Sequence, residues 1–217
     1  MGHVRLFRNS DRLAARHPHQ RRADRAGAGA RLLEAYNRHE HAVQAESPAV
    51  RYRHVLAEAL RRACEEEKVE LGADDATVLA ETLPYWPVFP DVAAELSALR
   101  EAGWRLALLT NCDRDLIAQT RRRLPVPFEA VVTAEDAGAY KPSDAHFELF
   151  RSSYEPEVWV HAAQSYFHDM EPAHRLGLPR VWINRHGARP SDPSIVPHEL
   201  PGLGGLLAAV ETAAAPS

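Results

Sequence analysis

The sequence has little of several features that mark special classes of protein. Its 217 residues include two cysteines, Cys64 and Cys112, too few for a disulfide framework and without metal-ligand spacing. No apolar run approaches the roughly 20 residues that span a bilayer, and the N-terminus lacks the apolar segment of a secretory signal. The net charge of −4 gives no reason to expect nucleic-acid binding. These absences predict a cytoplasmic protein that binds neither nucleic acid nor membrane.

Lysine is scarce as well. Of the 26 basic residues, only Lys68 and Lys141 are lysines, and the others are arginines. The planar guanidinium of arginine does not replace a compact ammonium at every site. A lysine in so arginine-rich a chain is therefore a candidate for a specific role.

The first part of the chain divides into two regions. Residues 1–29 are rich in Arg, Ala and Gly without helical or strand periodicity, which predicts an irregular leader. A transit peptide or a nucleic-acid-binding arm is the functional alternative. Residues 30–86 contain three successive helical patterns and no strand pattern, which predicts a helical subdomain.

Residues 87–217 alternate between helical and strand patterns. Strands are expected at WRLALLT, EAVVT, VWVHAA and RVWIN, with helices between them. A continuous apolar run such as residues 104–110 is typical of a parallel strand covered on both faces. The pattern predicts an α/β, Rossmann-like core with a parallel sheet, whose chemistry lies at the carboxyl ends of the strands.

Polar residues follow these strands in order. They are Thr110, Asn111, Lys141, Gln164, Ser165 and Asp169. Each type also has a purely structural explanation, since Thr-Asn pairs form turns, loop lysines are usually solvated, and an Asp before a helix is commonly its N-cap. Their order on successive strands favours a shared site.

Three segments resemble motifs of the haloacid dehalogenase-like (HAD) hydrolases. LALLTNCDRDLI resembles the second motif, AEDAGAYKPSDAHFE the third, and VHAAQSYFHDMEPAHRLGLPRVWINR the fourth. The helices from 30 to 84 resemble the helical cap of the family, so the resemblance covers roughly residues 30 to 186.

The resemblance implies catalytic roles for four residues. Thr110 would hydrogen-bond the transferred group or a substrate oxyanion, and Asn111 would help to position the substrate. Lys141 would neutralise the nucleophile, with Asp169 orienting it. An aspartate nucleophile would form an ester that water hydrolyses. Gln164 and Ser165, with Arg38 and Tyr52 of the cap, are candidate substrate-binding residues.

The chain departs from the family pattern at two places. Gln164 stands where phosphatases of the family carry an acidic residue, and a neutral amide is a poor ligand for Mg²⁺. This favours the metal-free 2-haloacid dehalogenase branch. The first motif, a strand followed by the aspartate nucleophile, is absent, because Asp11 and Asp24 are the only aspartates before the cap and neither follows an apolar strand.

A frameshift accounts for the missing motif. Read in the adjacent frame, codons for residues 3–13 are compatible with the peptide TFDCFGTLIDW, which resembles the first motif. In that frame the position two after the aspartate cannot be Asp, which phosphatases use there as a general acid. We therefore predict that residues 1–29 are a frameshift product and that the first core strand is absent or garbled.

Other candidates have simpler explanations. None of the twelve histidines lies in an HExxH motif, and they are predicted to be surface and loop residues. Cys112 has no obvious His partner in a triad order and is interpreted as a small residue capping the next helix.

The resemblance implies hydrolysis of a small anionic haloacid without a cofactor. A Mg²⁺-dependent small-molecule phosphatase of the same superfamily is one alternative. A catalytically inactive chain that only binds its ligand is another, because the nucleophile is missing. A homodimer is left open.

Overall fold

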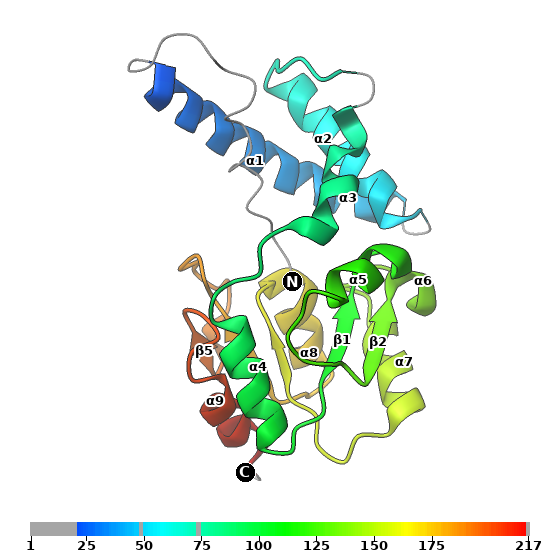
Figure 1. The fold of residues 1–217 in the computed structure, drawn as a ribbon, viewed down its shortest axis with the longest axis vertical. Coiled ribbons are helices and arrows are strands. Elements are labelled where there is room, and N and C mark those ends of the chain that lie inside the picture. Colours follow the sequence, from blue (N-terminus) through cyan, green and yellow to red (C-terminus); the bar gives the residue numbers. More distant parts are fainter. Residues whose placement is uncertain (1–20, 48–49, 73–74, 216–217) are drawn as a thin grey trace. The chain divides into compact units, whose positions relative to one another are not determined.

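The computed structural model describes residues 21–47, 50–72 and 75–215, which form two compact units divided between Trp86 and Pro87. The first unit is helical, and the second contains the described strands (Figure 1). Among the described helices, none is both long and apolar enough to cross a bilayer. The α/β fold class predicted from the sequence is confirmed.

The helical unit begins earlier than the apolar pattern predicted. Its helices are α1 (Arg21–Glu46), α2 (Tyr52–Glu66) and α3 (Val78–Thr82), with short 3₁₀ turns at Asp75–Thr77 and Leu83–Tyr85. The expectation of an irregular leader is wrong for residues 21–29, which belong to α1. Residues 1–20, including the segment read in the adjacent frame, lie outside the described residues.

Helices α1 and α2 pack through small and apolar side chains. The buried apolar residues at this contact are Ala35, Tyr36, Val43, Val55, Leu56, Ala59, Ala63 and Cys64. Ala59 and Ala63, four residues apart on α2, let the two helix backbones approach closely. The apolar side chains around them are removed from contact with water.

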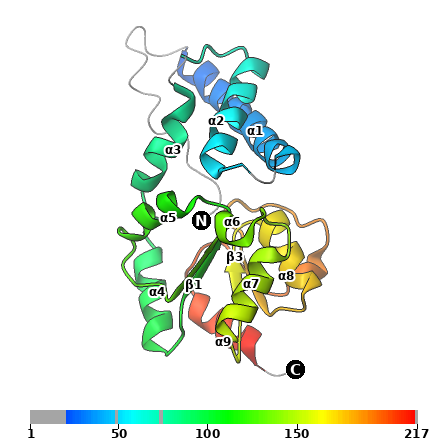
Figure 2. The same cartoon turned by 90° about the vertical axis from the view of Figure 1, so that its right-hand side faces the viewer.

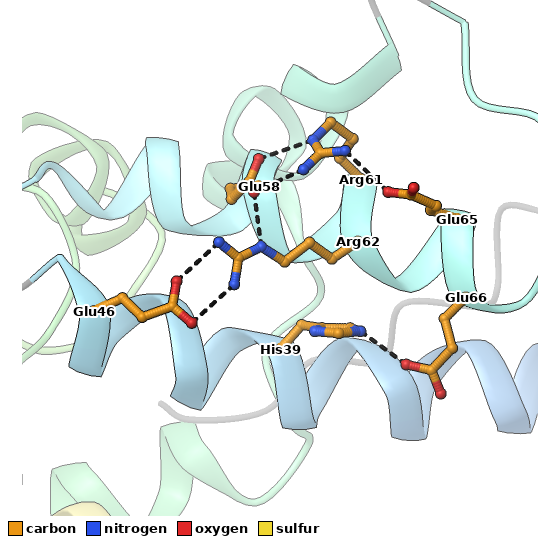
Figure 3. A network of polar contacts seen from close by, with 7 residues as sticks. All are labelled: His39, Glu46, Glu58, Arg61, Arg62, Glu65 and Glu66. Atoms are coloured by element: carbon orange, nitrogen blue, oxygen red, sulfur yellow. Dashed lines mark hydrogen bonds and ion pairs between the residues drawn. The ribbon is translucent and has the colours of Figure 1, made fainter.

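A network of ion pairs runs along the two helices (Figure 3). Both terminal nitrogens of Arg62 bind the carboxylate of Glu46, at 3.1 and 2.9 Å, and its Nε binds Glu58 at 2.7 Å. His39 contacts Glu66 at 2.8 Å. The planar guanidinium fits a carboxylate in this two-bond geometry. Because these side chains are a quarter to half exposed, the network contributes more to the alignment of α1 with α2 than to stability.

A carboxyl group is buried in the same unit. Glu40 is 4% exposed and accepts hydrogen bonds from the hydroxyl of Tyr52 at 2.6 Å and from the amide of Gln44 at 3.3 Å. Burial raises the pKa of Glu40, while the Tyr52 hydrogen bond lowers it in part. The folded chain therefore holds this proton more tightly than the unfolded chain, and Glu40 costs stability as the pH rises above its ordinary pKa.

Replacing this carboxyl with an amide tests that cost. We expect Glu40→Gln to stabilise the chain at pH 7 by about 1 kcal/mol, a typical size for one substitution, because the amide has no charge to desolvate. The gain should shrink at low pH, where Glu40 is protonated in both states. Urea unfolding at several pH values measures it, with the exposed Glu34→Gln as control. A uniform loss of stability at all pH values would contradict the interpretation.

The second unit alternates helices and strands. Its longer elements are α4 (Val92–Glu101), β1 (Ala107–Thr110), α5 (Arg114–Arg121), β2 (Ala130–Thr133), α6 (Ala134–Ala137), α7 (Ala145–Tyr154), β3 (His161–Ala163), α8 (Glu171–Arg175), β4 (Arg180–Ile183), β5 (Glu199–Leu200) and α9 (Leu206–Ala214). A π-helical turn, Tyr166–Met170, precedes α8. The four predicted strands form, each shorter than its apolar run, and β5 is an addition.

All strand pairs are parallel, but they form two sheets. Strands β1 and β2 pair in one sheet, with Thr110 opposite Thr133. The other sheet has the order β3-β4-β5, with Ala163 opposite Trp182. Parallel strands bring their carboxyl ends to one edge, so the polar residues after β1, β2 and β3 gather at the same end of this unit.

Helices cover the strands on two sides (Figure 2). On one side Leu99 of α4 and Leu206 and Val210 of α9 pack against Val181 and Ile183 of β4. On the other side lie α7 and α8, whose apolar residues pack under β1 and β2. They are Phe147, Phe150 and Ala173, with Leu109, Ala130 and Val132 from the strands. Phe147 of α7 also lies against His161 of β3, with ring centroids 4.9 Å apart, so this helix layer contacts both sheets.

Strand β1 is less buried than its sequence predicted. All four of its residues are half-buried, whereas all four residues of β4 are buried. The expectation that this strand is covered on both faces is therefore wrong. Strand β1 pairs with β2 alone, β3 pairs with β4 alone, and no described residue before Ala107 forms a strand. A first core strand that is absent, as predicted, would account for both the split sheet and the partial exposure of β1.

Candidate functional site

The site lies at the carboxyl ends of β1, β2 and β3, and Lys141 is at its centre. The side chain of Lys141 is 8% exposed. Its ammonium donates to the backbone oxygen of Leu109 at 2.8 Å and to Oδ1 of Asp169 at 2.5 Å. Since Leu109 belongs to β1 and Asp169 follows β3, this one group connects the ends of both sheets.

Asn111 fixes the backbone of Lys141. Its side-chain oxygen accepts from the Lys141 backbone N–H at 2.7 Å, and its side-chain nitrogen donates to the Lys141 backbone oxygen at 3.1 Å. A side chain that makes both bonds sets the position of the whole residue. Asn111 therefore supports Lys141 in this structure, and a contact with substrate remains a prediction.

The carboxylate of Asp169 accepts from two buried groups, the ammonium of Lys141 and the ring of His161. Asp169 lies inside the π-helical turn, whose N-cap is Ser165. Asp169 is therefore not the N-cap that its position before a helix suggested. Its Oδ1 also receives Nε2 of His161 at 3.0 Å. Burial raises the pKa of Asp169, but the Lys141 charge and the His161 hydrogen bond lower it more, so the carboxyl stays ionised.

A second buried histidine holds the end of β1. His146 of α7 is fully buried, and its Nε2 lies 3.1 Å from the backbone oxygen of Thr110. Burial and the nearby Lys141 charge lower the pKa of His146 to about 4. The ring is neutral at pH 7, so Nε2–H donates to the Thr110 carbonyl and fixes the tautomer.

Thr110 and Cys112 form a tight turn after β1. The Thr110 hydroxyl oxygen accepts from the Cys112 backbone N–H at 3.1 Å. Burial and the Asp113 charge raise the pKa of the Cys112 thiol to about 12. A thiol that stays protonated is not a nucleophile. The expectation that Cys112 caps the next helix is wrong, because Asp113 is the N-cap of α5.

Gln164 and Ser165 make local contacts at the tip of β3. The backbone oxygen of Gln164 accepts from the indole N–H of Trp182 at 2.9 Å. The Ser165 hydroxyl caps the following turn, accepting from the His168 backbone N–H at 3.1 Å. Neither side chain bonds directly to Lys141 among the described contacts. Their substrate-binding roles remain predictions.

Arg38 and Tyr52 belong to the helical unit. Arg38 forms ion pairs with Glu66 at 2.6 Å and Glu34 at 3.6 Å. The hydroxyl of Tyr52 binds Glu40. Both side chains thus have partners within their own unit, and their assignment to substrate, like that of residues 30–86 to a cap, remains a prediction.

Sequence reasoning missed the buried histidines. His146, His161 and His168 are 0%, 8% and 6% exposed, so the surface and loop interpretation is wrong for them. A signal was present in two cases, because His161 interrupts an apolar strand and His146 precedes Phe147 on the apolar face of its helix. A polar side chain at such a position needs a buried partner.

The described donors at this edge do not fit Mg²⁺. Asp169 is already bound by Lys141 and His161, and Gln164 offers only a neutral amide. Mg²⁺ takes hard oxygen ligands, mainly carboxylates and water. In the part of the chain that the structure describes, no group of three or more His, Cys, Asp or Glu side chains could hold a metal ion.

Comparison with known proteins identifies the family. A family model described as haloacid dehalogenase-like hydrolase matches residues 1–167. The chain belongs to this family. The segments around Thr110 and Lys141 lie within the matched residues and Asp169 lies just beyond them, so the motif roles of these three residues remain predictions.

Individual relatives include dehalogenases and a phosphatase. Haloacetate dehalogenase H-2 of Moraxella sp. (strain B) is 31% identical over 144 residues, 64% of this chain and 63% of that protein. Phosphoserine phosphatase of Thermus thermophilus is 30% identical over 116 residues, 52% of this chain and 46% of that protein. The chain thus spans about half to three-fifths of the length of these relatives.

Solved structures show the same fold. L-2-haloacid dehalogenase from Xanthobacter autotrophicus matches with a TM-score of 0.71 and 16% identity, over 87% of this chain and 89% of that one. At this identity the likeness establishes the fold of this HAD hydrolase and leaves its substrate open.

Breaking the ion pair between Lys141 and Asp169 tests how much it contributes to the free energy of unfolding. We expect Asp169→Asn to destabilise the chain by about 3–5 kcal/mol, because it leaves the Lys141 ammonium buried without its counter-charge. The double variant Lys141→Met with Asp169→Asn should lose less than the sum of its single variants. Urea unfolding measures these losses, with the exposed Arg114→Gln as a control expected to change little. Strict additivity would show that the two groups do not interact.

The neutral state of His146 gives a pH dependence. Its pKa falls from 6.5 to about 4 on folding, so the unfolded chain binds the proton first as the pH drops. Stability should therefore fall from pH 6.5 to about 4, by at most about 1.4 kcal/mol per pH unit from this group. His146→Gln should remove that slope, while the exposed His186→Gln should keep it. Equal slopes in all three chains, measured by urea unfolding, would refute a neutral buried His146.

Proposed function

We propose that the site hydrolyses a small 2-haloacid by the dehalogenase chemistry of its family, once a carboxylate nucleophile is present. The observation that carries the proposal is the buried Lys141 ammonium, held by the Leu109 oxygen and by Asp169. Two of its three N–H donors are used in these bonds, and the third has no partner among the described residues. This third N–H can donate a hydrogen bond to a substrate carboxylate or to the nucleophile.

The reaction has two steps. A carboxylate oxygen attacks C2 of the haloacid, so that a C–O bond forms while the carbon–halogen bond breaks and the halide leaves with the bonding electron pair. Water then hydrolyses the ester, releasing the 2-hydroxyacid and regenerating the carboxylate. Lys141 stabilises the nucleophilic carboxylate and the negative charge around the reacting carbon, and Thr110 hydrogen-bonds the substrate.

The nucleophile belongs to the frame-restored N-terminal segment. Asp169 is assigned to the support of Lys141 instead, because its carboxylate is buried and its Oδ1 accepts from both Lys141 and His161. The adjacent-frame peptide TFDCFGTLIDW supplies an aspartate in the position now held by Arg5. As written, the chain keeps the anion-binding groups and lacks the group that forms the ester, so we propose that it binds substrate without turnover.

Two features support haloacids over phosphate esters. Gln164 replaces the acidic residue of the phosphatases, and the described donors do not fit Mg²⁺. The haloacetate dehalogenase relative is the longer of the two matches given above. The phosphoserine phosphatase relative makes Mg²⁺-dependent phosphatase activity the second candidate.

Activity of a repaired chain tests the proposal. Residues 3–13 are replaced by TFDCFGTLIDW, and a matched control carries TFNCFGTLIDW. We expect halide release from 2-chloropropionate only with the aspartate-containing chain, and no phosphate release from p-nitrophenyl phosphate with Mg²⁺. In that chain Lys141→Met should lower the rate by about 10²–10³-fold, as for loss of one preorganised electrostatic group.

Each result has a clear meaning. Phosphate release without halide release would replace the dehalogenase assignment with the phosphatase. Absence of both reactions, with 2-chloropropionate still binding, would favour the binding-only alternative. Halide release by the chain as written would refute the account of the nucleophile.

A further inference from the structure

His161 occupies an unusual place for an imidazole. It is the first residue of β3, 8% exposed, and its ring lies 4.9 Å from that of Phe147 and 6.4 Å from that of Trp159. An aromatic hydrocarbon would fill this apolar position equally well. The imidazole adds one feature, an Nε2 placed 3.0 Å from Oδ1 of Asp169.

The Asp169 oxygen that receives His161 also receives Lys141. An ionised carboxylate accepts hydrogen bonds only, so Nε2 of His161 carries the proton and donates it. Two donors converging on one oxygen fix the carboxylate rotation about its χ angles. Without His161 the Asp169 carboxylate can rotate, and its Oδ1 no longer holds the Lys141 ammonium in one position.

We propose that His161 is a positioning residue, which sets the place of the Lys141 ammonium through Asp169. His161 acts on Lys141 only through Asp169 and makes no contact with substrate in this role. The inference rests on the proposed function only for the catalytic role of Lys141. The position of the Lys141 ammonium can be tested without turnover.

The scarcity of lysine supplies the experiment. Lys141 is buried and Lys68 is exposed in the other unit, so Lys68 is an internal reference for chemical labelling. Acetic anhydride is added to the folded chain at low conversion, and mass spectrometry gives the ratio of acetylation at Lys141 to that at Lys68. Burial and ion pairing should make this ratio at most about 0.1, since an ion-paired ammonium must first release its proton and its partner.

Variants separate the donor from the packing. His161→Phe keeps the ring contacts and removes the N–H, and it should raise the labelling ratio at least threefold. His161→Gln keeps an amide N–H that reaches Asp169, and it should retain the original ratio. Trp159→Phe disturbs the ring contacts without touching the donor, so its ratio should also stay unchanged.

The pattern across variants decides the proposal. An unchanged ratio in His161→Phe, or an equal rise in His161→Phe and His161→Gln, would overturn it. Circular dichroism shows whether each variant is folded. If His161→Phe fails to fold, His161→Asn, whose amide is too short to reach Asp169, takes its place with the same expected rise. Failure of halide release in the repaired chain would leave this ratio unaffected, so the two proposals fail separately.

Discussion

The buried ion pair between Lys141 and Asp169 is the interaction on which the strand-containing unit depends. An ammonium that leaves water is tolerated only where a counter-charge and hydrogen bonds replace its hydration. Here the Leu109 oxygen and the Asp169 carboxylate do so, and they come from two separate sheets. The same contact therefore closes the carboxyl ends of the fold and lies at the centre of the candidate site, so the stability of this unit and its proposed chemistry depend on the same atoms.

Much of the fold could be predicted because periodicity is local information. The apolar runs ending at Thr110 and Thr133 give the positions of β1 and β2 to within a few residues. Helix α1 was predicted to start too late, since its first turns lack an apolar stripe, although Ala and Arg favour helix. Strand β5 has only two residues in a Pro-rich segment, and its pairing with β4 depends on tertiary contacts that no local pattern contains.

The sequence predicted the charged residues of the candidate site, Lys141 and Asp169. It did not predict the buried histidines that hold the site in place. Lys141 and Asp169 each follow a strand, so topology alone brings them together. His146 and His161 act through buried hydrogen bonds to residues 36 and 8 positions away, and only the folded chain shows their partners. The half-buried state of β1 was also missed, because the apolar run of that strand suits a neighbour that no described residue supplies.

Hydrogen exchange of β1 tests the central claim, that a nucleophile-bearing strand is missing beside it. In the chain as written, amides of β1 on the side away from β2 should exchange far faster than those of β4, which has a partner on both sides. In the chain with residues 3–13 replaced by TFDCFGTLIDW, β1 and β3 should become as protected as β4. Protection of β1 equal to that of β4 in the chain as written would contradict the account.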